Sequence, residues 1–295
     1  TLVGDDNNNS LIGAAGNDYL SGGLGDDYLE GGTGSDTVDY SALGSGIEVT
    51  LNDTTAASVK VGANTNDHTI VNIENIIGTT SADTITGDAN ANSLFGDAGV
   101  DYIDGSAGND YIEGGANTSG TETLIGGIGL DTIYGGTGVD HILGGDDDDK
   151  LYGGDQNDTL DGGAGVDTLT GGEGDDTLIG GAGNDNLVGG NGNDTADYSN
   201  ESASVQANIA NSFAVGGSIG TDTFSGIENI TGSNLGGEQD NITGSSGDNT
   251  LKGLAGDDTI SVLAGNDVVE GGAGNDYIYA GAGDDTIDGD DTDGA

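Results

Sequence analysis

The chain has 295 residues, of which 62 are glycine and 53 are aspartate or glutamate, and it contains no proline, cysteine, methionine or tryptophan. Its formal charge of −50 repels phosphate groups over the whole surface, which excludes nucleic acid and anionic membranes as partners and makes multivalent cations the natural counter-ions. The lack of cysteine removes disulfides and thiolate metal sites, so a secreted chain of this kind needs another form of bracing.

The chain begins at Thr1 with no charged and apolar leader, and it has no apolar run of membrane-spanning length. We therefore expect no membrane insertion, and we expect a processed form or an excised piece of a longer protein. These features are compatible with a secreted or cell-surface protein that is exported by a leader-less (type I) route.

Residues 1–39 introduce a nonapeptide repeat that starts at Gly4. The segment 22–30 matches the pattern G-G-x-G-x-D-x-U-x in full, where U is a large apolar residue. A fixed period of this kind indicates a repeat architecture. The complete opening of the pattern, from its first glycine to its aspartate, recurs in the same frame at Gly22, Gly31, Gly126, Gly135, Gly162, Gly171, Gly180, Gly189 and Gly271.

Each part of the unit has a physical role. Glycine at positions 1, 2 and 4 permits positive φ angles and close backbone approach in a tight turn. Positions 7 to 9 should alternate outward, inward and outward, as in a half-buried strand. One inward residue per unit makes a thin core, which cannot by itself offset an ordering cost of roughly 1–2 kcal/mol per residue. The predicted inward residues, at position 8, are Leu20, Leu29, Val38, Ile85, Leu94, Ile103, Ile112, Ile133, Ile142, Leu151, Leu160, Leu169, Leu178, Leu187, Leu251, Ile260, Val269, Ile278 and Ile287.

These units resemble the repeats-in-toxin (RTX) family, the haemolysin-type calcium-binding nonapeptide repeats. The resemblance implies an all-β fold, a parallel β-roll or β-solenoid, in which the first part of each unit turns and its last three positions form a strand. Two nonapeptide units then make one coil of the solenoid. In this family, calcium ions lie between successive turns and are held by aspartates and by turn carbonyls.

Two inserts, residues 40–77 and 198–231, interrupt the repeats and resemble each other. Each begins with Asp-Tyr-Ser and ends with Ile-Glu-Asn-Ile followed one residue later by glycine. Between these motifs, apolar residues alternate at Ile47, Val49 and Leu51 in the first insert and at Val205, Ala207 and Ile209 in the second. Alternation predicts strands. We expect longer rungs that continue the solenoid, with small separate lobes as the alternative.

In the main block, residues 78–197, position 6 is aspartate in nearly every unit. Coils lie about 4.8 Å apart, so aspartates two units apart should form columns. Two carboxylates about 5 Å apart repel by on the order of 3 kcal/mol at an effective dielectric of 20. The alternative, that these aspartates only cap turns, does not explain a column. The two columns are Asp131, Asp149, Asp167 and Asp185, and Asp140, Asp158, Asp176 and Asp194.

Calcium is the cofactor that this pattern predicts, because it takes six to eight hard oxygen ligands from carboxylates and carbonyls. We expect several ions along the chain. The predicted metal ligands are Asp18, Asp27, Asp36, Asp83, Asp101, Asp110, Asp131, Asp140, Asp149, Asp158, Asp167, Asp176, Asp185, Asp194, Asp258, Asp267, Asp276 and Asp285.

Several positions depart from the pattern, and sites there should be weaker or empty. Asparagine replaces the position-6 aspartate at Asn9, Asn92 and Asn249, and Val262 and Ala280 replace the first glycine. The third block, residues 232–295, opens with a stretched unit in which Asp240 fits position 6 only when counted back from Ile242. We expect the three blocks and two inserts to form one continuous solenoid.

We expect no catalytic groups in this sequence. The segment 216–220 matches G-x-S-x-G, but that motif needs a strand-to-helix turn, a histidine and an acid, and no helical pattern follows it. We expect both histidines, His68 and His141, to be solvated, and no H-E-x-x-H motif occurs. The chain is therefore predicted not to be an enzyme.

The ten tyrosines occupy outward strand positions or open the inserts. Tyr134 and Tyr152 are two units apart and should stack on adjacent rungs. Glycan binding by an exposed tyrosine face is the functional alternative. The column of Thr159, Thr177 and Thr195 is not a clean threonine array, because acidic residues flank it, which disfavours ice binding.

The sequence favours a calcium-dependent structural module of a secreted or cell-surface protein, such as an adhesin stalk or a surface-layer component, which folds when it meets extracellular calcium. Its partners would be calcium and, beyond it, further copies of itself, other surface proteins or glycans. The alternative is the C-terminal secretion and folding module of an exported hydrolase, epimerase or toxin. The repeats fill the chain and leave no room for a catalytic domain, which favours the first interpretation.

Overall fold

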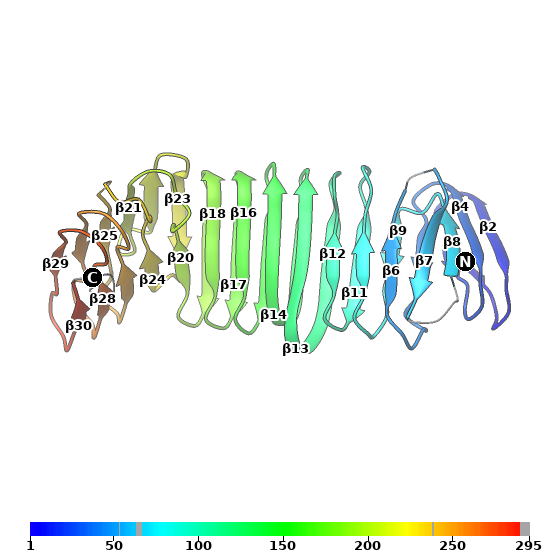
Figure 1. The fold of residues 1–295 in the computed structure, drawn as a ribbon, viewed down its shortest axis with the longest axis horizontal. Coiled ribbons are helices and arrows are strands. Elements are labelled where there is room, and N and C mark those ends of the chain that lie inside the picture. The colour runs from blue at the N-terminus through cyan, green and yellow to red at the C-terminus, as the bar shows by residue number, and fades with distance from the viewer. Residues whose placement is uncertain (53, 63–66, 238, 290–295) are drawn as a thin grey trace. The chain divides into compact units, whose positions relative to one another are not determined.

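The computed structural model describes residues 1–52, 54–62, 67–237 and 239–289, and the secondary structure in these residues is all β. The chain forms two compact units, Thr1–Asp155 and Gln156–Ala295. In Figure 1 the strands of each unit follow one another as successive rungs, drawn from blue to green in the first unit and from green to red in the second. The predicted all-β parallel roll is confirmed in each unit.

Most strands of the first unit are short and pair in parallel with the strand one coil away. Leu20 pairs with Val38, and Ile85 with Ile103, at the predicted spacing of two nonapeptides. Its strands are β1 (Leu2–Val3), β2 (Ser10–Ala15), β3 (Tyr19–Ser21), β4 (Tyr28–Thr33), β5 (Thr37–Asp39), β6 (Ile47–Thr50), β7 (Ala57–Val61), β8 (Asp67–Val71), β9 (Asn75–Ile77), β10 (Thr84–Thr86), β11 (Ser93–Ala98), β12 (Tyr102–Asp104), β13 (Tyr111–Ile128), β14 (Thr132–Asp146) and β15 (Lys150–Asp155).

The second unit follows the same rule, with Leu160 paired to Leu178 and Ile242 to Ile260. Its strands are β16 (Thr159–Gly165), β17 (Thr168–Glu173), β18 (Thr177–Gly183), β19 (Asn186–Asn191), β20 (Thr195–Asp197), β21 (Val205–Asn208), β22 (Phe213–Gly216), β23 (Gly220–Ser225), β24 (Asn229–Thr231), β25 (Asn241–Thr243), β26 (Thr250–Lys252), β27 (Thr259–Ser261), β28 (Val268–Glu270), β29 (Tyr277–Tyr279) and β30 (Thr286–Asp288).

Many strands extend beyond positions 7 to 9, to which the resemblance confined them. β4, β11 and β15 each continue over the glycines or other residues at positions 1 to 3 of the next unit. These positions still pair with the neighbouring coil, as Gly136 does with Gly154. The turn proper is therefore shorter in these units than the resemblance implied.

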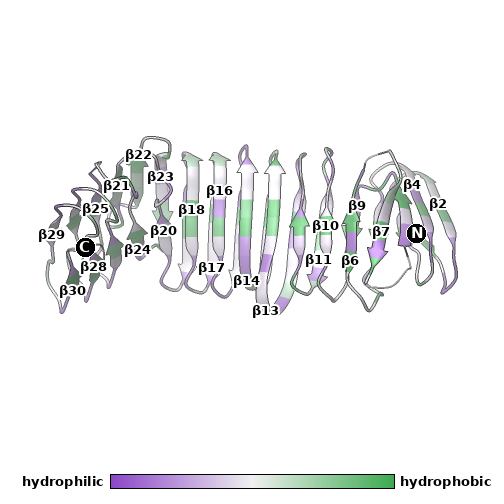
Figure 2. Ribbon diagram, in the orientation of Figure 1, coloured by the Kyte–Doolittle hydropathy of each residue, from purple (hydrophilic) through white to green (hydrophobic). Residues whose placement is uncertain are grey.

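In the regular coils the core consists of two rows of aliphatic side chains from position 8, because residues two nonapeptides apart pair with each other, as Leu160 does with Leu178 and Leu169 with Leu187. All the predicted inward residues are fully buried except Ile278, which is half-buried, and Ile287, which is 45% exposed. Figure 2 shows these residues as green bands in strands such as β14 and β18. The predicted outward–inward–outward pattern is thus confirmed, and the core is as thin as the sequence indicates.

The glycines serve two different purposes. At position 1, a β-carbon on Gly126 would overlap the carboxylate of Asp131 in its own unit and approach the carbonyl oxygen of Gly144 in the next coil. At positions 2 and 4 the requirement is conformational, since Gly23 and Gly25 have φ angles of 90° and 110°. Only glycine adopts that region without strain.

Both inserts form strands that continue the stack of their own unit, and each also contains a reversed middle strand that the sequence did not predict. In the first insert, β8 pairs in parallel with β4 and β6 pairs in parallel with β10, while β7 lies antiparallel between β6 and β8. The second insert repeats this with β23 on β19, β21 on β25, and β22 antiparallel between them. The alternation predicted the strands, but it carries no information about the reversal of the middle one.

Candidate metal sites

The position-6 aspartates of successive coils are linked by one repeated hydrogen bond. The backbone N–H of Asp131 donates to Oδ1 of Asp149 at 2.8 Å, and that of Asp176 donates to Oδ1 of Asp194 at 2.9 Å. Each such bond joins residues one coil apart, so one carboxylate oxygen of each aspartate is fixed by the preceding coil. The predicted columns of aspartate therefore exist within each unit.

The second carboxylate oxygen, Oδ2, is buried and points into the turn of its own unit. At Asp131 it lies against Gly126, close to where the carbonyl oxygen of Gly144 arrives from the next coil. A buried carboxylate oxygen without a donor is costly, and an oxygen-binding cation would remove that cost. Among the described residues, no hydrogen-bond partner reaches Oδ2 of Asp18, Asp36, Asp101, Asp110, Asp131, Asp176, Asp194, Asp258, Asp267 and Asp276.

Burial raises the pKa of these carboxyl groups. The pKa of Asp131 and of Asp194 is raised to about 6, and that of Asp110 to about 7, with loss of hydration as the largest cause. Hydrogen bonds from the neighbouring backbone oppose this shift only in part. The columns are therefore poorly stabilised as anions by the protein alone, and they suit a hard cation.

The described residues hold no cluster of three or more histidine, cysteine, aspartate or glutamate side chains that could bind a metal ion without other ligands. The position-6 arrangement instead brings one carboxylate per unit together with backbone oxygens, as in Asp131 beside the Gly144 carbonyl. Calcium accepts such mixed carboxylate and carbonyl ligands. The residues present therefore fit calcium, with the turn supplying the remaining oxygens.

The predicted ligands are not all alike. Asp18, Asp276 and Asp285 are half-buried, and the other predicted ligands are buried. Asp83 differs from the rest, because its Oδ1 accepts from the N–H of Ile47 and its Oδ2 accepts from the N–H of Thr79, each at 2.6 Å. Protein donors thus occupy both of its oxygens, and Asp83 is the buried ligand candidate with the least need of an ion.

The asparagines at position 6 occupy the same place with a neutral side chain. Asn92 accepts from the N–H of Asp88 in its own turn and donates through Nδ2 to the carbonyl oxygen of Glu74. Asn249 likewise accepts from the N–H of Ser245 and donates to the carbonyl oxygen of Glu228. An amide supplies both hydrogen-bonding roles without charge. That these sites are weak for calcium stays a prediction, now with a physical reason.

Four acidic residues in the columns were missed by the sequence analysis. Glu74 and Glu228, from the Ile-Glu-Asn-Ile motifs, accept from the N–H of Asp36 and Asp194. Asp222 accepts from the N–H of Asp185 in the same way. The fourth is Glu122, in the stretched unit 114–125. If Leu124 is assigned to position 8, counting back two residues places Glu122 at position 6. The same count from Ile242 places Asp240 at position 6.

A second ladder runs along position 5, which the repeat pattern leaves unspecified. The N–H of Asn193 donates to Oδ1 of Asp175 at 2.9 Å, and the N–H of Asn275 donates to Oδ1 of Asp257 at 2.8 Å. Here the side chain serves the following coil, whereas the position-6 side chain serves the preceding one. Each turn is thus hydrogen-bonded through its side chains both to the preceding coil and to the following coil.

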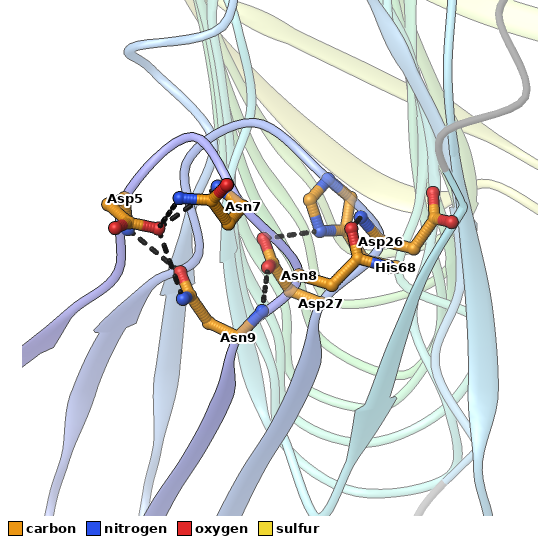
Figure 3. A network of polar contacts seen from close by, with 7 residues as sticks. All are labelled: Asp5, Asn7, Asn8, Asn9, Asp26, Asp27 and His68. Carbon is orange, nitrogen blue, oxygen red and sulfur yellow. Dashed lines mark hydrogen bonds and ion pairs between the residues drawn. The ribbon is translucent and has the colours of Figure 1, made fainter.

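The expectation that His68 is solvated was wrong. The side chain is 1% exposed and lies in the column register of the first insert, with Nδ1 3.0 Å from Oδ2 of Asp27. Figure 3 shows the imidazole on one side of the Asp27 carboxylate and Asn9 on the other, where the N–H of Asn9 donates to Oδ1. Residues 63–66, which precede β8, lie outside the described residues, and the sequence alone gave no register for the strand.

Two other expectations concern side chains outside the columns. Tyr134 and Tyr152 stack as predicted, with ring centroids 4.6 Å apart and planes 6° apart. The G-x-S-x-G segment lies in the hairpin between β22 and β23, and the Ser218 hydroxyl donates to Glu201. A hairpin does not present a serine as the strand-to-helix elbow does. In the described part of the chain, no helix is long and apolar enough to cross a membrane.

The geometry defines a class of protein, a parallel β-roll whose turns present columns of buried carboxylates to cations. The RTX calcium-binding nonapeptide repeat (4 copies) matches residues 3–38, 72–103, 86–118, 117–150, 134–169, 161–196, 236–269 and 262–293. These matches cover more than half of the chain, which belongs to this family of calcium-binding structural modules. RTX repeat proteins are typically extracellular.

Comparison with whole proteins adds little. No curated protein sequence matches the chain. Among solved structures, the chain is similar to the extracellular lipase LipA from Serratia marcescens, with 21% identity over 76% of this chain and 37% of the lipase chain, and a TM-score of 0.15. The chain thus spans little more than a third of that lipase, and at this TM-score the likeness carries no argument about fold or activity.

Proposed function

We propose that this chain is a non-catalytic, calcium-dependent structural module of a secreted or cell-surface protein, and that it folds when it meets extracellular calcium. The observation that carries the proposal is the column of buried carboxylates whose second oxygen has no donor among the described residues, as at Asp131 and Asp194. A rigid roll of this kind suits an adhesin stalk or a component of a surface layer.

The thin core explains why folding would depend on the ion. One aliphatic side chain per nonapeptide is buried, and the backbone is rich in glycine, whose ordering is costly. An ion bound at ten times its dissociation constant contributes only about 1.4 kcal/mol, but many sites in series make the transition steep. Extracellular calcium modules bind at about 10⁻⁴–10⁻³ M, which would keep the chain unfolded in a calcium-poor cytosol.

The test is a calcium titration of the full chain, followed by circular dichroism. We expect little β signal in chelator and a cooperative gain of it between about 10⁻⁴ and 10⁻³ M calcium. Magnesium at the same concentrations is the control, because its small octahedral shell fits these mixed sites poorly. A native β signal in chelator would contradict the proposal.

A surface-layer component and a monomeric stalk differ in self-association. Light scattering on the calcium-loaded chain separates them, since growth of large assemblies on calcium addition supports the lattice role and a constant monomer mass supports the stalk. Both results are compatible with a calcium-dependent structural module.

A further inference from the structure

The stretched unit, residues 114–125, is longer than a regular unit, and the nonapeptide pattern assigns no metal ligand in it. Its strand nevertheless stays in the column register, because Tyr102 pairs with Thr123 and Glu122 pairs with Asp140. Glu122 therefore takes the position that aspartate holds in a regular unit.

Glu122 also reproduces the surroundings of a column aspartate. Its Oε1 accepts from the N–H of Asp101 at 3.2 Å, as Oδ1 of a regular aspartate accepts from the preceding coil. The side chain is 1% exposed, no N–H or hydroxyl donor among the described residues reaches its Oε2, and its carboxyl group lies within hydrogen-bonding reach of the Asp101 carboxyl group. That oxygen lies against Gly114, where the carbonyl oxygen of Gly135 arrives from the next coil.

A second oxygen of the stretched unit replaces a missing carbonyl. In regular coils the position-4 glycine faces a turn carbonyl oxygen of the preceding coil, so that a β-carbon on Gly129 would overlap the carbonyl oxygen of Gly108. At Gly138, whose preceding coil is the stretched unit, the overlap would be with the side-chain amide of Asn117 instead, of which Oδ1 is the nearest atom. Asn117 is 4% exposed, and its Oδ1 has no hydrogen-bond partner in the described part of the chain.

We propose that Glu122 and Asn117 rebuild a calcium site in the stretched unit, with a longer carboxylate in place of aspartate and a side-chain amide oxygen in place of a turn carbonyl. The Nδ2 atom of Asn117 donates to Oδ1 of Asp140 at 3.2 Å, which aims the amide at the column. The ion column would then pass through this irregular unit without a gap. The inference rests on the proposed calcium function.

The test compares two substitutions of Glu122 in the full chain. Glu122→Gln keeps the length and the acceptor for Asp101 but removes the charge, whereas Glu122→Asp keeps the charge and shortens the reach. A metal ligand predicts one calcium fewer per chain for Glu122→Gln and the full number for Glu122→Asp. If the role of Glu122 is purely structural, the glutamine variant should bind as many calcium ions as the wild type, and the shorter aspartate variant should be the one that is impaired.

Bound calcium is counted by equilibrium dialysis and elemental analysis, with folding checked by circular dichroism in saturating calcium. Glu113→Gln is the matched control, because Glu113 lies on the same strand, pairs with Tyr134 on the outer face and should leave the count unchanged. If the glutamine variant fails to fold while the aspartate variant folds and binds the full number, the proposal stands, because charge is then what the site requires.

Equal calcium numbers in wild type, Glu122→Gln and Glu113→Gln would overturn this inference and leave the proposed function intact, as would equal damage from both Glu122 substitutions. Absence of calcium binding by the wild-type chain would instead contradict the proposed function. Asn117→Ala supplies a second readout, for which we expect one ion to bind several-fold more weakly.

Discussion

The two inserts have the same pattern of strand pairing, but the residue that continues the carboxylate column differs between them. In both, the tyrosine of Asp-Tyr-Ser is buried, and the glutamate of Ile-Glu-Asn-Ile accepts from the N–H of a column aspartate. In the second insert the column residue is Asp222, whose Oδ2 accepts from the Tyr198 hydroxyl at 3.1 Å. In the first insert the column residue is His68, which faces Asp27.

The difference shows two ways of removing the need for an ion. A tyrosine hydroxyl satisfies the second oxygen of Asp222, and in the first insert an imidazole replaces a carboxylate altogether. The stretched unit does neither, because Glu122 keeps a buried carboxylate oxygen that no N–H or hydroxyl donor among the described residues reaches. We therefore expect the two inserts to bind no calcium in these columns and the stretched unit to bind it.

The inserts also bury more apolar surface than the regular coils. A regular unit buries one aliphatic residue in nine, whereas the described part of the first insert, within residues 40–77, buries ten apolar side chains: Tyr40, Leu43, Ile47, Val49, Leu51, Val59, Val61, Ile70, Ile73 and Ile76. Apolar burial contributes about 25 cal/mol per Å², so these segments depend less on ions for their stability.

Lowering calcium should release the regular coils before the inserts. Hydrogen exchange of the full chain during stepwise chelation should show loss of protection in regular strands such as β16 to β18 at higher calcium than in β23 and β24 of the second insert. The reason is that the former rely on ions and the latter on apolar burial and the Tyr198–Asp222 bond. Simultaneous loss of protection in all strands would contradict the contrast.

His68→Asp should convert the first insert into a segment that needs calcium. It places a second carboxylate against Asp27 Oδ2, a repulsion of on the order of 3 kcal/mol for charges about 5 Å apart at an effective dielectric of 20. We expect a higher calcium midpoint for folding, measured by circular dichroism, and one additional bound ion. His141→Asp, at a half-buried outward position, is the control. An unchanged midpoint for His68→Asp would break the account of the first insert.

Tyr198→Phe should destabilise the calcium-loaded chain by about 1–3 kcal/mol, the cost of leaving a buried acceptor unsatisfied. The matched control is Tyr40→Phe, because the Tyr40 hydroxyl is buried with no hydrogen-bond partner among the described residues. We expect that control to cost less than the Tyr198 change in denaturant unfolding at saturating calcium. Equal costs would show that the Tyr198–Asp222 bond contributes nothing particular.

Without calcium, lowering the pH from 8 to about 5 should partly replace the ion and restore part of the β signal. Burial raises the pKa of Asp131 in the folded chain to about 6, well above its value in the unfolded chain. The folded state therefore binds protons that the unfolded state does not, so the free energy of unfolding rises as the pH falls through 6 and falls again as the pH rises. Calcium needs the ionised carboxylate, so the proton and the ion are alternative partners for the same buried oxygen.

The effect can be measured by circular dichroism in chelator between pH 8 and pH 5. Asp131→Asn should reduce the pH dependence of the β signal and also the number of calcium ions that the chain binds at pH 8. Asp222→Asn should reduce only the pH dependence, because burial raises the pKa of Asp222 to about 7 but Tyr198, not an ion, satisfies its second oxygen. Loss of a bound calcium ion in both variants would contradict the distinction between regular coils and inserts.

The sequence predicts the regular coils well because every unit repeats the same local chemistry. The period places Leu160 inward and Asp158 at the turn, and the structure buries both as expected. Positive φ at Gly23 and Gly25 follows from the same pattern. Each unit contributes one strand and two units make one coil, so residues two nonapeptides apart pair in parallel, as Leu160 does with Leu178.

The irregular segments could not be predicted in this way, because their register depends on pairing with strands outside the repeat frame. His68 enters the column only because β8 pairs with β4, and Asp222 only because β23 pairs with β19. Neither strand has a nonapeptide header to count from. Glu122 was within reach of the sequence, since the buried Leu124 fixes the count, but the additional residues of the stretched unit obscured it.

The central claim is that calcium ions occupy the regular carboxylate columns and are absent from the columns of the inserts. A crystal structure of the calcium-loaded chain with anomalous data collected at long wavelength locates each ion directly. The account predicts anomalous peaks beside Oδ2 of regular aspartates such as Asp131 and Asp194, and none beside His68 or Asp222. Peaks absent from the regular columns, or equally strong at His68 and Asp222, would contradict it.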